Sequence, residues 1–279
     1  MTKHSQSVTD LKIRMSIGRK YSLNSGAPNC QACTSVLYPG RLHAYELIVS
    51  SALQVQTAIR THDYSPSMQV VSINVGAAKA VAYRTASESI TASEKLPVEG
   101  CVWIGADGVE GDDSGDRHNH HDAWMKVYAY SVEDYNYWSS ELGAPVGPGQ
   151  FSENLTTSGV DLNAALVGEV WRVGGALLQI SHVRIPCQTF KGWMGASGYD
   201  ETAWVKRFTA AARPGPYLRV LEEGEVRAGD LITVEARPAH DVTVAELFRA
   251  LTTERSLLPR LAQVVGLKPW IYDKVREAL

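Results

Sequence analysis

The spacing of hydrophobic and polar residues divides the chain into three stretches of different texture. Residues 1–67 mix polar, basic and small residues without a sustained period, apart from a short helical pattern within 45–59. At residue 68 the texture changes to the strand-like run 69–75, which ends at a glycine. We therefore expect the folded protein to begin near residue 68, and residues 1–67 to be a disordered or non-native N-terminal extension.

Short β-rich runs separated by Gly, Asp and Pro turns fill residues 68–238. One helix is expected at 131–142, with Ser131 as N-cap and Asp134 at the capping-box position. Many short strands with frequent turns are typical of a barrel-like mixed or antiparallel sheet, and a further short helix at 204–209 is expected on its outside. The predicted strands are 127–130, a hairpin formed by 168–173 and 176–180, then 217–221 and 231–235.

Residues 239–279 change to a helical period. Thr243 and Glu246 fit a capping box at the start of a first helix. A second helix is expected to stop at Gly266, and a third to begin at Pro269. The predicted fold class is therefore mainly β (α+β), a barrel-like domain with peripheral helices and a small C-terminal three-helix bundle.

The charge distribution narrows the choice of partners. The net charge is -3, and residues 1–67 hold seven of the 27 Lys and Arg but three of the 30 Asp and Glu. The remainder is mildly acidic, which argues against nucleic acid or an anionic membrane as the main partner. From His240 onward six Lys and Arg face five Asp and Glu, too balanced for a DNA-binding face, so the last helices are expected to serve packing or a homodimer.

Cysteine usage and hydropathy indicate the compartment. Four cysteines, at 30, 33, 101 and 187, form no dense disulfide framework, which favours a reducing cytoplasm. The pair Cys30 and Cys33 makes one CxxC, which we interpret as incidental because no second ligand pair follows. The chain shows neither a secretory h-region nor an apolar run of the roughly 20 residues needed to cross a bilayer.

Two polar clusters are candidates for binding. Residues 111–122 hold three histidines, several carboxylates and Arg117, a set suited to a metal or an anion, although its spacing fits no standard zinc signature and a solvated loop is equally compatible. Residues 147–157 combine permissive glycines with Glu153 and Asn154, which supply an acceptor and a bifunctional amide. The same residue types also occur in ordinary turns.

The third candidate is the thiol of Cys187. Pro186 directly precedes it and favours an extended or turning backbone over a helix. Arg184 lies three residues upstream, and a nearby guanidinium favours the thiolate, the form in which sulfur attacks carbon or binds a metal. Local sequence alone leaves a second interpretation open, a small buried hydrophobic side chain without chemistry.

Taken in order, these clusters resemble the MOSC family, named for the C-terminal domain of molybdenum-cofactor sulfurase, and most closely its YiiM-like branch. The resemblance covers roughly residues 68–238, and the C-terminal helices resemble the three-helix appendage of that branch. It rests on the Gly- and Asp-rich run 111–122, the run 149–156, the pair Gly168-Glu169, and 184–187.

The resemblance implies binding of the molybdenum cofactor (molybdopterin), with Cys187 as the catalytic residue and metal or sulfur ligand. It also implies reduction of N-hydroxylated small molecules such as 6-hydroxylaminopurine. Cationic and polar donors would hold the cofactor, whose phosphate tail needs them. The residues expected to bind it are Arg117, His120, Glu153, Asn154 and Arg184.

Two positions depart from the family pattern. The family's His-Gly-Gly element reads His120-His121-Asp122 here, and the glycine of its Gly-Glu-Asn-Leu element is Ser152. If that glycine serves a positive φ angle, Ser152 strains the loop.

The alternatives to a reductase are a sulfur or cofactor carrier that turns over no substrate, and an inactive member of the family. The chain has no Gly-rich phosphate loop, serine elbow or dinucleotide fingerprint. A reductase would therefore draw its electrons from a donor protein.

Overall fold

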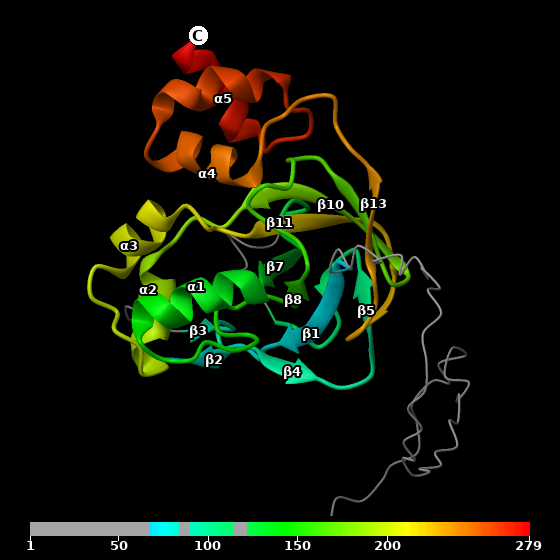
Figure 1. Cartoon of the computed structure of the whole chain (residues 1–279), viewed down its shortest axis with the longest axis vertical. Helices are drawn as coiled ribbons and strands as arrows, with labels where there is room; N and C mark the ends of the chain where they lie inside the picture. Colours follow the sequence, from blue (N-terminus) through cyan, green and yellow to red (C-terminus); the bar gives the residue numbers. More distant parts are fainter. Residues whose placement is uncertain (1–66, 84–89, 114–121) are drawn as a thin grey trace, which may run out of the picture. The chain divides into compact units, whose positions relative to one another are not determined.

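The computed structural model describes residues 67–83, 90–113 and 122–279, and all of them belong to one of the two units into which the chain divides, Gln54–Leu279. The N-terminal extension predicted for 1–67 lies outside these residues, apart from its last residue. Figure 1 shows the elements in chain order. They are β1 (Gln69–Val75), β2 (Lys79–Ala80), β3 (Ile90–Thr91), β4 (Leu96–Val98), β5 (Cys101–Gly105), β6 (Gly108–Val109), β7 (Val127–Ser131), α1 (Val132–Leu142), β8 (Leu155–Ser158), β9 (Val170–Val173), β10 (Ala176–Val183), α2 (Gln188–Ala196), α3 (Trp204–Ala211), β11 (Pro216–Glu222), β12 (Gly224–Arg227), β13 (Ile232–Ala236), α4 (Val244–Thr252), the 3-10 helix η2 (Arg255–Gln263) and α5 (Pro269–Ala278).

Eight strands form the main sheet, in the order β13-β9-β10-β11-β7-β8-β1-β4. Its pairs are antiparallel except β7 with β8, which run parallel because α1 carries the chain from one to the other. The first residues of β1 also contact the turn before β13. Val70 donates its N–H to the carbonyl of Asp230 (2.9 Å), and Gln69 forms an isolated β-bridge with Leu231. The sheet therefore curls back on itself, and the mainly β architecture with peripheral helices is confirmed.

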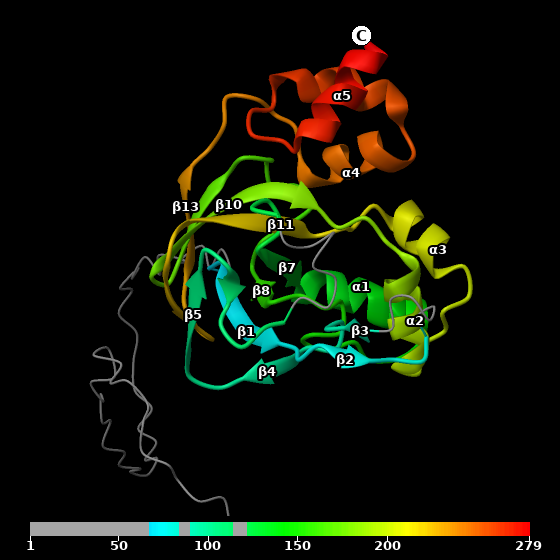
Figure 2. The same ribbon diagram turned by 180° about the vertical axis from the view of Figure 1, so that it is seen from behind.

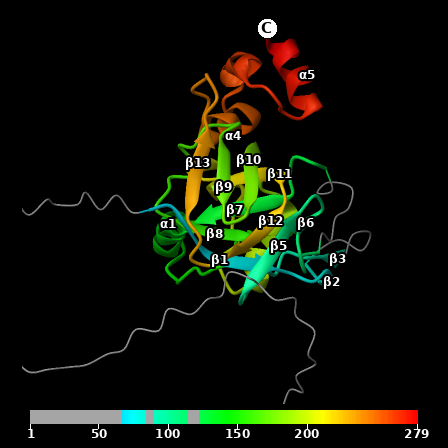
Figure 3. The same ribbon diagram turned by 90° about the vertical axis from the view of Figure 1, so that its right-hand side faces the viewer.

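Two smaller sheets complete the β structure of the described residues. The strands β12, β5 and β6 form one, and Figure 3 shows them together on one side of the main sheet. The short pair β2 and β3 forms the other, and Figure 2 shows it beside α2.

Aromatic side chains fill the space between α1, α2, α3 and the sheet. Trp138 of α1 stacks on Phe208 of α3, with ring centroids 5.7 Å apart, and Phe151 stacks on Tyr130 of β7 at 4.3 Å. Phe190 of α2 meets both Phe151 and Phe208 edge-on. Burial of such large rings is a main source of stability, so these contacts hold α2 and its N-terminus against the sheet.

The local signals read from the sequence are confirmed for most elements. Ser131 caps α1 by accepting the N–H of Asp134, and Thr243 caps α4 by accepting that of Glu246. Two differences have clear causes. The second C-terminal helix is 3-10 rather than α because Pro259 lies inside it and cannot donate a helical hydrogen bond. Helix α2 was not predicted, because its residues have no apolar period beyond the pair Phe190 and Met194.

Candidate functional site

Cys187 lies at the junction between the sheet and α2, at the N-cap of that helix. Its backbone is extended (φ -130°, ψ 173°), as Pro186 predicts, and its side chain is exposed. No side chain caps the helix, so the first N–H groups of α2 point toward the surroundings of the thiol. The positive end of a helix favours negative charge, and this position therefore suits a thiolate or an anionic ligand.

Arg184 reaches the same region from the end of β10 and is 9 % exposed. Its guanidinium lies over the rings of Phe190 (4.2 Å to the centroid) and Tyr128 (5.0 Å). Its Nε atom is buried without a hydrogen-bond partner, and none of the ion pairs among the described residues includes it. Burying a cation without a carboxylate counterion costs free energy. An anionic ligand that bound Arg184 would reduce this cost.

Glu153 is completely buried, and its carboxylate is satisfied within the protein. One oxygen accepts from the Tyr135 hydroxyl and from the N–H of Gly149 (2.5 Å), and the other from the N–H of Phe151 (3.1 Å). Burial raises the pKa of Glu153, and its hydrogen-bond donors oppose that shift. The structure shows Glu153 holding the 147–153 loop together, and its contact with a cofactor stays a prediction.

Asn154 joins three segments beneath that loop. Its Oδ1 accepts the N–H of Tyr128 in β7 (3.1 Å), and its Nδ2 donates to the carboxylate of Asp112 (2.8 Å). Asp112 also accepts the N–H of Gly76 (2.8 Å) and pairs with the buried Lys95. This amide therefore ties β7 and β1 to the stretch that enters the polar cluster at 111–122.

The other predicted binding residues, Arg117 and His120, lie outside the described residues. Both ends of their segment are placed. Asp113 donates its N–H to the carbonyl of Gly76 (2.8 Å), and Asp122 pairs with Lys268 (2.5 Å). The structure brings Arg184 and Asn154 together through Tyr128, which contacts both. Glu153 directly precedes Asn154, and Cys187 lies three residues after Arg184.

Sequence reasoning missed Lys95, Tyr128 and Tyr217 as members of this region. The rings of the two tyrosines lie 4.8 Å apart, and Tyr128 lies under the Arg184 guanidinium. No motif marks them, because a strand tyrosine is an ordinary core residue. Their register opposite one another in β7 and β11 could be recognised only once the strands were paired.

Ser152 confirms the strain expected from its place in the sequence. Its φ angle is 59°, in the left-handed region that favours glycine, and its hydroxyl is buried without a partner. The conformation is imposed by its neighbours, because Ser152 donates its N–H to the Gly149 carbonyl (2.9 Å) while Glu153 binds the loop from below.

The residues present fit an anionic cofactor better than a protein-only metal cage. Within the described ranges, no three His, Cys, Asp or Glu side chains come close enough to hold a metal ion. A metal held here would therefore bring most of its ligands with it, with Cys187 supplying a thiolate. The orphaned Nε of Arg184 and the uncapped N-terminus of α2 match the negative charge of such a group.

Comparison with known proteins identifies the class. Residues 116–233 match the model of the MOSC domain family, so this part of the chain is a MOSC domain. Within that class it resembles YiiM. The crystal structure of YiiM from Geobacillus stearothermophilus superimposes with a TM-score of 0.60 at 25% identity, covering 76% of this chain and 99% of that one. YiiM from Escherichia coli shares the fold, with a TM-score of 0.57.

Sequence relatives point the same way. YflK of Bacillus subtilis is 29% identical over 175 residues, which cover 63% of this chain and 76% of YflK. YiiM of Escherichia coli is 28% identical over 178 residues, 62% of this chain and 75% of YiiM. A protein of Gibberella moniliformis named "Reductase" is 27% identical over 186 residues, but these make up 32% of its own length.

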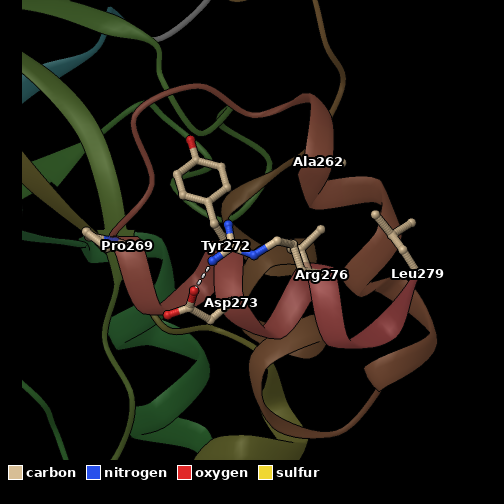
Figure 4. A pocket seen from close by; sticks show the side chains of 7 residues that line it. Ala262, Pro269, Tyr272, Asp273, Arg276 and Leu279 are labelled. Atoms are coloured by element: carbon tan, nitrogen blue, oxygen red, sulfur yellow. Dashed lines mark hydrogen bonds and ion pairs between the residues drawn. The ribbon is translucent and has the colours of Figure 1, made fainter.

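A separate hollow lies on the C-terminal helices. It measures about 350 Å³, and Figure 4 shows Tyr272, Asp273 and Arg276 of α5 around it, with the last two joined as an ion pair. The hydroxyl of Tyr272 accepts the N–H of Gly266 (2.9 Å).

In the part of the chain that the structure describes, no helix combines the length and apolar character needed to span a membrane.

Proposed function

We propose that this protein binds the molybdenum cofactor with Cys187 as a ligand and reduces N-hydroxylated compounds such as 6-hydroxylaminopurine. The observation that supports this most is the pairing of an exposed thiol with the buried Arg184, whose Nε lacks a partner. When bound, the cofactor supplies the two-electron redox chemistry. The name of the Gibberella moniliformis relative, "Reductase", agrees with the proposal, and the matched region makes up 32% of that protein.

The chain's own residues would bind the cofactor and orient it toward the substrate. Arg184 would supply a buried cation for the anionic part of the cofactor, and its guanidinium is held against the rings of Tyr128 and Phe190. Asn154 fixes the loop beneath it, and the exposed Cys187 leaves room for a substrate to approach. In the overall reaction the N–O bond breaks, and two electrons and two protons yield an amine and water. The electrons come from a donor protein.

Metal analysis of protein from a molybdenum-replete host tests the proposal. We expect molybdenum and pterin in the native protein, their loss in Cys187→Ser, and their retention in the matched control Cys101→Ser, whose cysteine lies in β5. Arg184→Met should lower cofactor content while retaining the apolar stem.

Two results would contradict this function. Full molybdenum content and reductase activity in Cys187→Ser would remove the role of the thiol. A persulfide on Cys187, found by mass spectrometry in a protein without reductase activity, would favour the sulfur carrier, and the absence of both would indicate an inactive member.

A further inference from the structure

One carboxylate lies near the candidate site without a role in the proposed chemistry. Asp122 is a residue at which the sequence departs from the His-Gly-Gly element, and it lies in the turn before β7. Its side chain is 35 % exposed. A free negative charge at this position would weaken the binding of an anionic ligand at Arg184.

Tyr217 relates the positions of Asp122 and Arg184 to each other. Burial raises the pKa of Tyr217, Arg184 opposes this shift, and Asp122 adds to it. The ring of Tyr217 also lies 4.8 Å from that of Tyr128, whose centroid is 5.0 Å from the Arg184 guanidinium. The Asp122 carboxylate is therefore within electrostatic range of the place where Arg184 would meet an anion.

A lysine of the C-terminal helices neutralises the Asp122 carboxylate. Lys268 directly precedes α5 and is 7 % exposed. Its ammonium pairs with Oδ2 of Asp122 (2.5 Å) and donates to the sulfur of Met125 (2.7 Å). The other oxygen of Asp122 accepts the N–H of Trp124 (3.1 Å), so both oxygens have partners within the protein.

The turn that carries Lys268 is held in place from two sides. The hydroxyl of Tyr272 accepts the N–H groups of Gly266 (2.9 Å) and Leu267 (3.2 Å). The indole N–H of Trp124 donates to the Gly266 carbonyl (2.7 Å). Because the backbone before Lys268 is fixed in this way, its ammonium reaches Asp122 with little loss of entropy.

The second carboxylate near Arg184, that of Glu153, also has other partners. Burial lowers the pKa of Arg184, and the charge of Glu153 is among the effects that raise it. The oxygens of Glu153 accept hydrogen bonds from the N–H groups of Gly149 and Phe151. Arg184 thus keeps an unpartnered Nε although two carboxylates lie near it, because each carboxylate is bound elsewhere.

We propose that Lys268 is a positioning residue of the candidate site, which preserves the affinity of the buried Arg184 for an oxyanion by neutralising Asp122. The inference rests on the proposed function in one respect, that the ligand at Arg184 is anionic. It goes beyond that function because it makes the C-terminal helices part of the site. Lys268 acts through Asp122 and does not need to contact the ligand.

Titration of the full-length protein with inorganic phosphate tests the role of the pair, using protein from a host that makes no molybdopterin. At about pH 8, above the ordinary pKa of histidine, His182 stays neutral because burial lowers its pKa. Lys268→Met leaves a negative charge at Asp122 and should weaken phosphate binding roughly fivefold or more. Lys268→Arg keeps the ion pair and should bind phosphate as the native protein does.

The charge pair also allows binding to be separated from folding. In the double variant Asp122→Asn with Lys268→Met both charges are absent, so phosphate affinity should return to within about twofold of the native value. Asp122→Asn alone leaves a buried ammonium without its carboxylate, which lowers stability but adds a positive charge near Arg184. It should therefore bind phosphate at least as tightly as the native protein, while Lys268→Met is the more stable variant and the weaker binder.

Two further variants serve as controls. Arg184→Met should abolish phosphate binding, and Arg276→Met, which leaves Asp273 unpaired on the exposed side of α5, should not change it. The inference is wrong if the native protein binds no phosphate, or if the binding survives in Arg184→Met. It is also wrong if Lys268→Met binds phosphate as tightly as the native protein, or if Asp122→Asn binds it more weakly than Lys268→Met.

These results separate the inference from the proposed function. Phosphate affinities in the expected order, with no molybdenum in protein from a molybdenum-replete host, would keep the role of Lys268 and lose the reductase. Native levels of molybdenum and pterin in Lys268→Met, with unchanged phosphate affinity, would keep the cofactor and lose the role of Lys268.

Discussion

Buried polar atoms at the site differ in whether they have a hydrogen-bond partner within the protein. Those that have one stabilise the site, and those that have none are available to a ligand. Glu153 and Asn154 are both buried, and their side-chain oxygens accept hydrogen bonds from the protein. Arg184 is buried as well, but its Nε has no partner. Because an unsatisfied buried group costs more than a satisfied one gains, Arg184 is the residue for which a ligand would make the largest difference.

Ser152 gives the first prediction at this scale. Ser152→Gly should raise the free energy of unfolding by about 1 kcal/mol, because glycine relieves the positive φ and removes a buried hydroxyl without a partner, against a smaller entropic cost. Urea unfolding measures it.

The control is Ser140→Gly in the exposed part of α1, where glycine should instead lower the free energy of unfolding by about 0.5 kcal/mol. A loss of stability in both variants would show that the loop is unstrained.

At the scale of elements, β10 and the residue that follows it place two buried basic side chains, His182 and Arg184, near the candidate site. His182 lies in β10 opposite Tyr217 of β11, and Arg184 follows two residues later. His182 is 4 % exposed, its Nδ1 has no partner, and its ring meets the Trp270 edge at 6.0 Å. Burial, with Lys268 nearby, lowers the pKa of His182 to about 3.

This depressed pKa predicts acid sensitivity. Below pH 6.5 the unfolded chain takes up a proton on His182 that the folded protein does not accept until about pH 3, so stability is lost as the pH falls. Between pH 7.5 and 5.5 the loss in the free energy of unfolding from His182 should be about 1 kcal/mol. The free energy of unfolding of His182→Phe should therefore fall by that much less than that of the native protein over the same interval. An equal fall in both proteins would contradict a neutral buried histidine.

For the described residues together, the C-terminal helices pack on the β domain instead of standing apart. Phe248 of α4 meets Phe208 of α3 edge-on at 6.3 Å, and the indole N–H of Trp124 donates to the Gly266 carbonyl (2.7 Å). The boundary predicted between residues 238 and 239 separates the β-rich runs from the helical period of the sequence. The contacts of Phe248 and Gly266 with the β domain cross this boundary. The boundary itself stays a prediction.

The pair Lys268 and Asp122 tests this connection. Lys268 is 7 % exposed, so Asp122→Asn would leave a buried ammonium without its carboxylate and should cost about 2 kcal/mol or more. Lys268→Met removes the charge itself and should cost less than about 1 kcal/mol. The free energies of unfolding of the two single variants test whether the ion pair is buried. In the double variant, Lys268→Met should restore most of the stability that Asp122→Asn removes. Equal costs for the two single variants would show that the pair is solvated.

The sequence by itself determined the local features of this protein. The capping residues Ser131 and Thr243 placed two helices, the short β-rich runs between turns placed the main strands, and Pro186 predicted an extended Cys187. The order of the polar clusters was sufficient to identify the MOSC class. These signals depend on neighbours within a few residues, which the chain carries in every conformation.

The tertiary structure alone decided which polar groups are satisfied and which are not. Glu153 and Asn74 are 79 residues apart in the chain, and Lys95 meets Asp112 only because β1, β4 and β8 are paired. A hydrogen bond requires two groups within about 3 Å, and strand pairing brings them there from distant segments. The unpartnered Nε of Arg184 is a consequence of that pairing, which no local pattern in the sequence records.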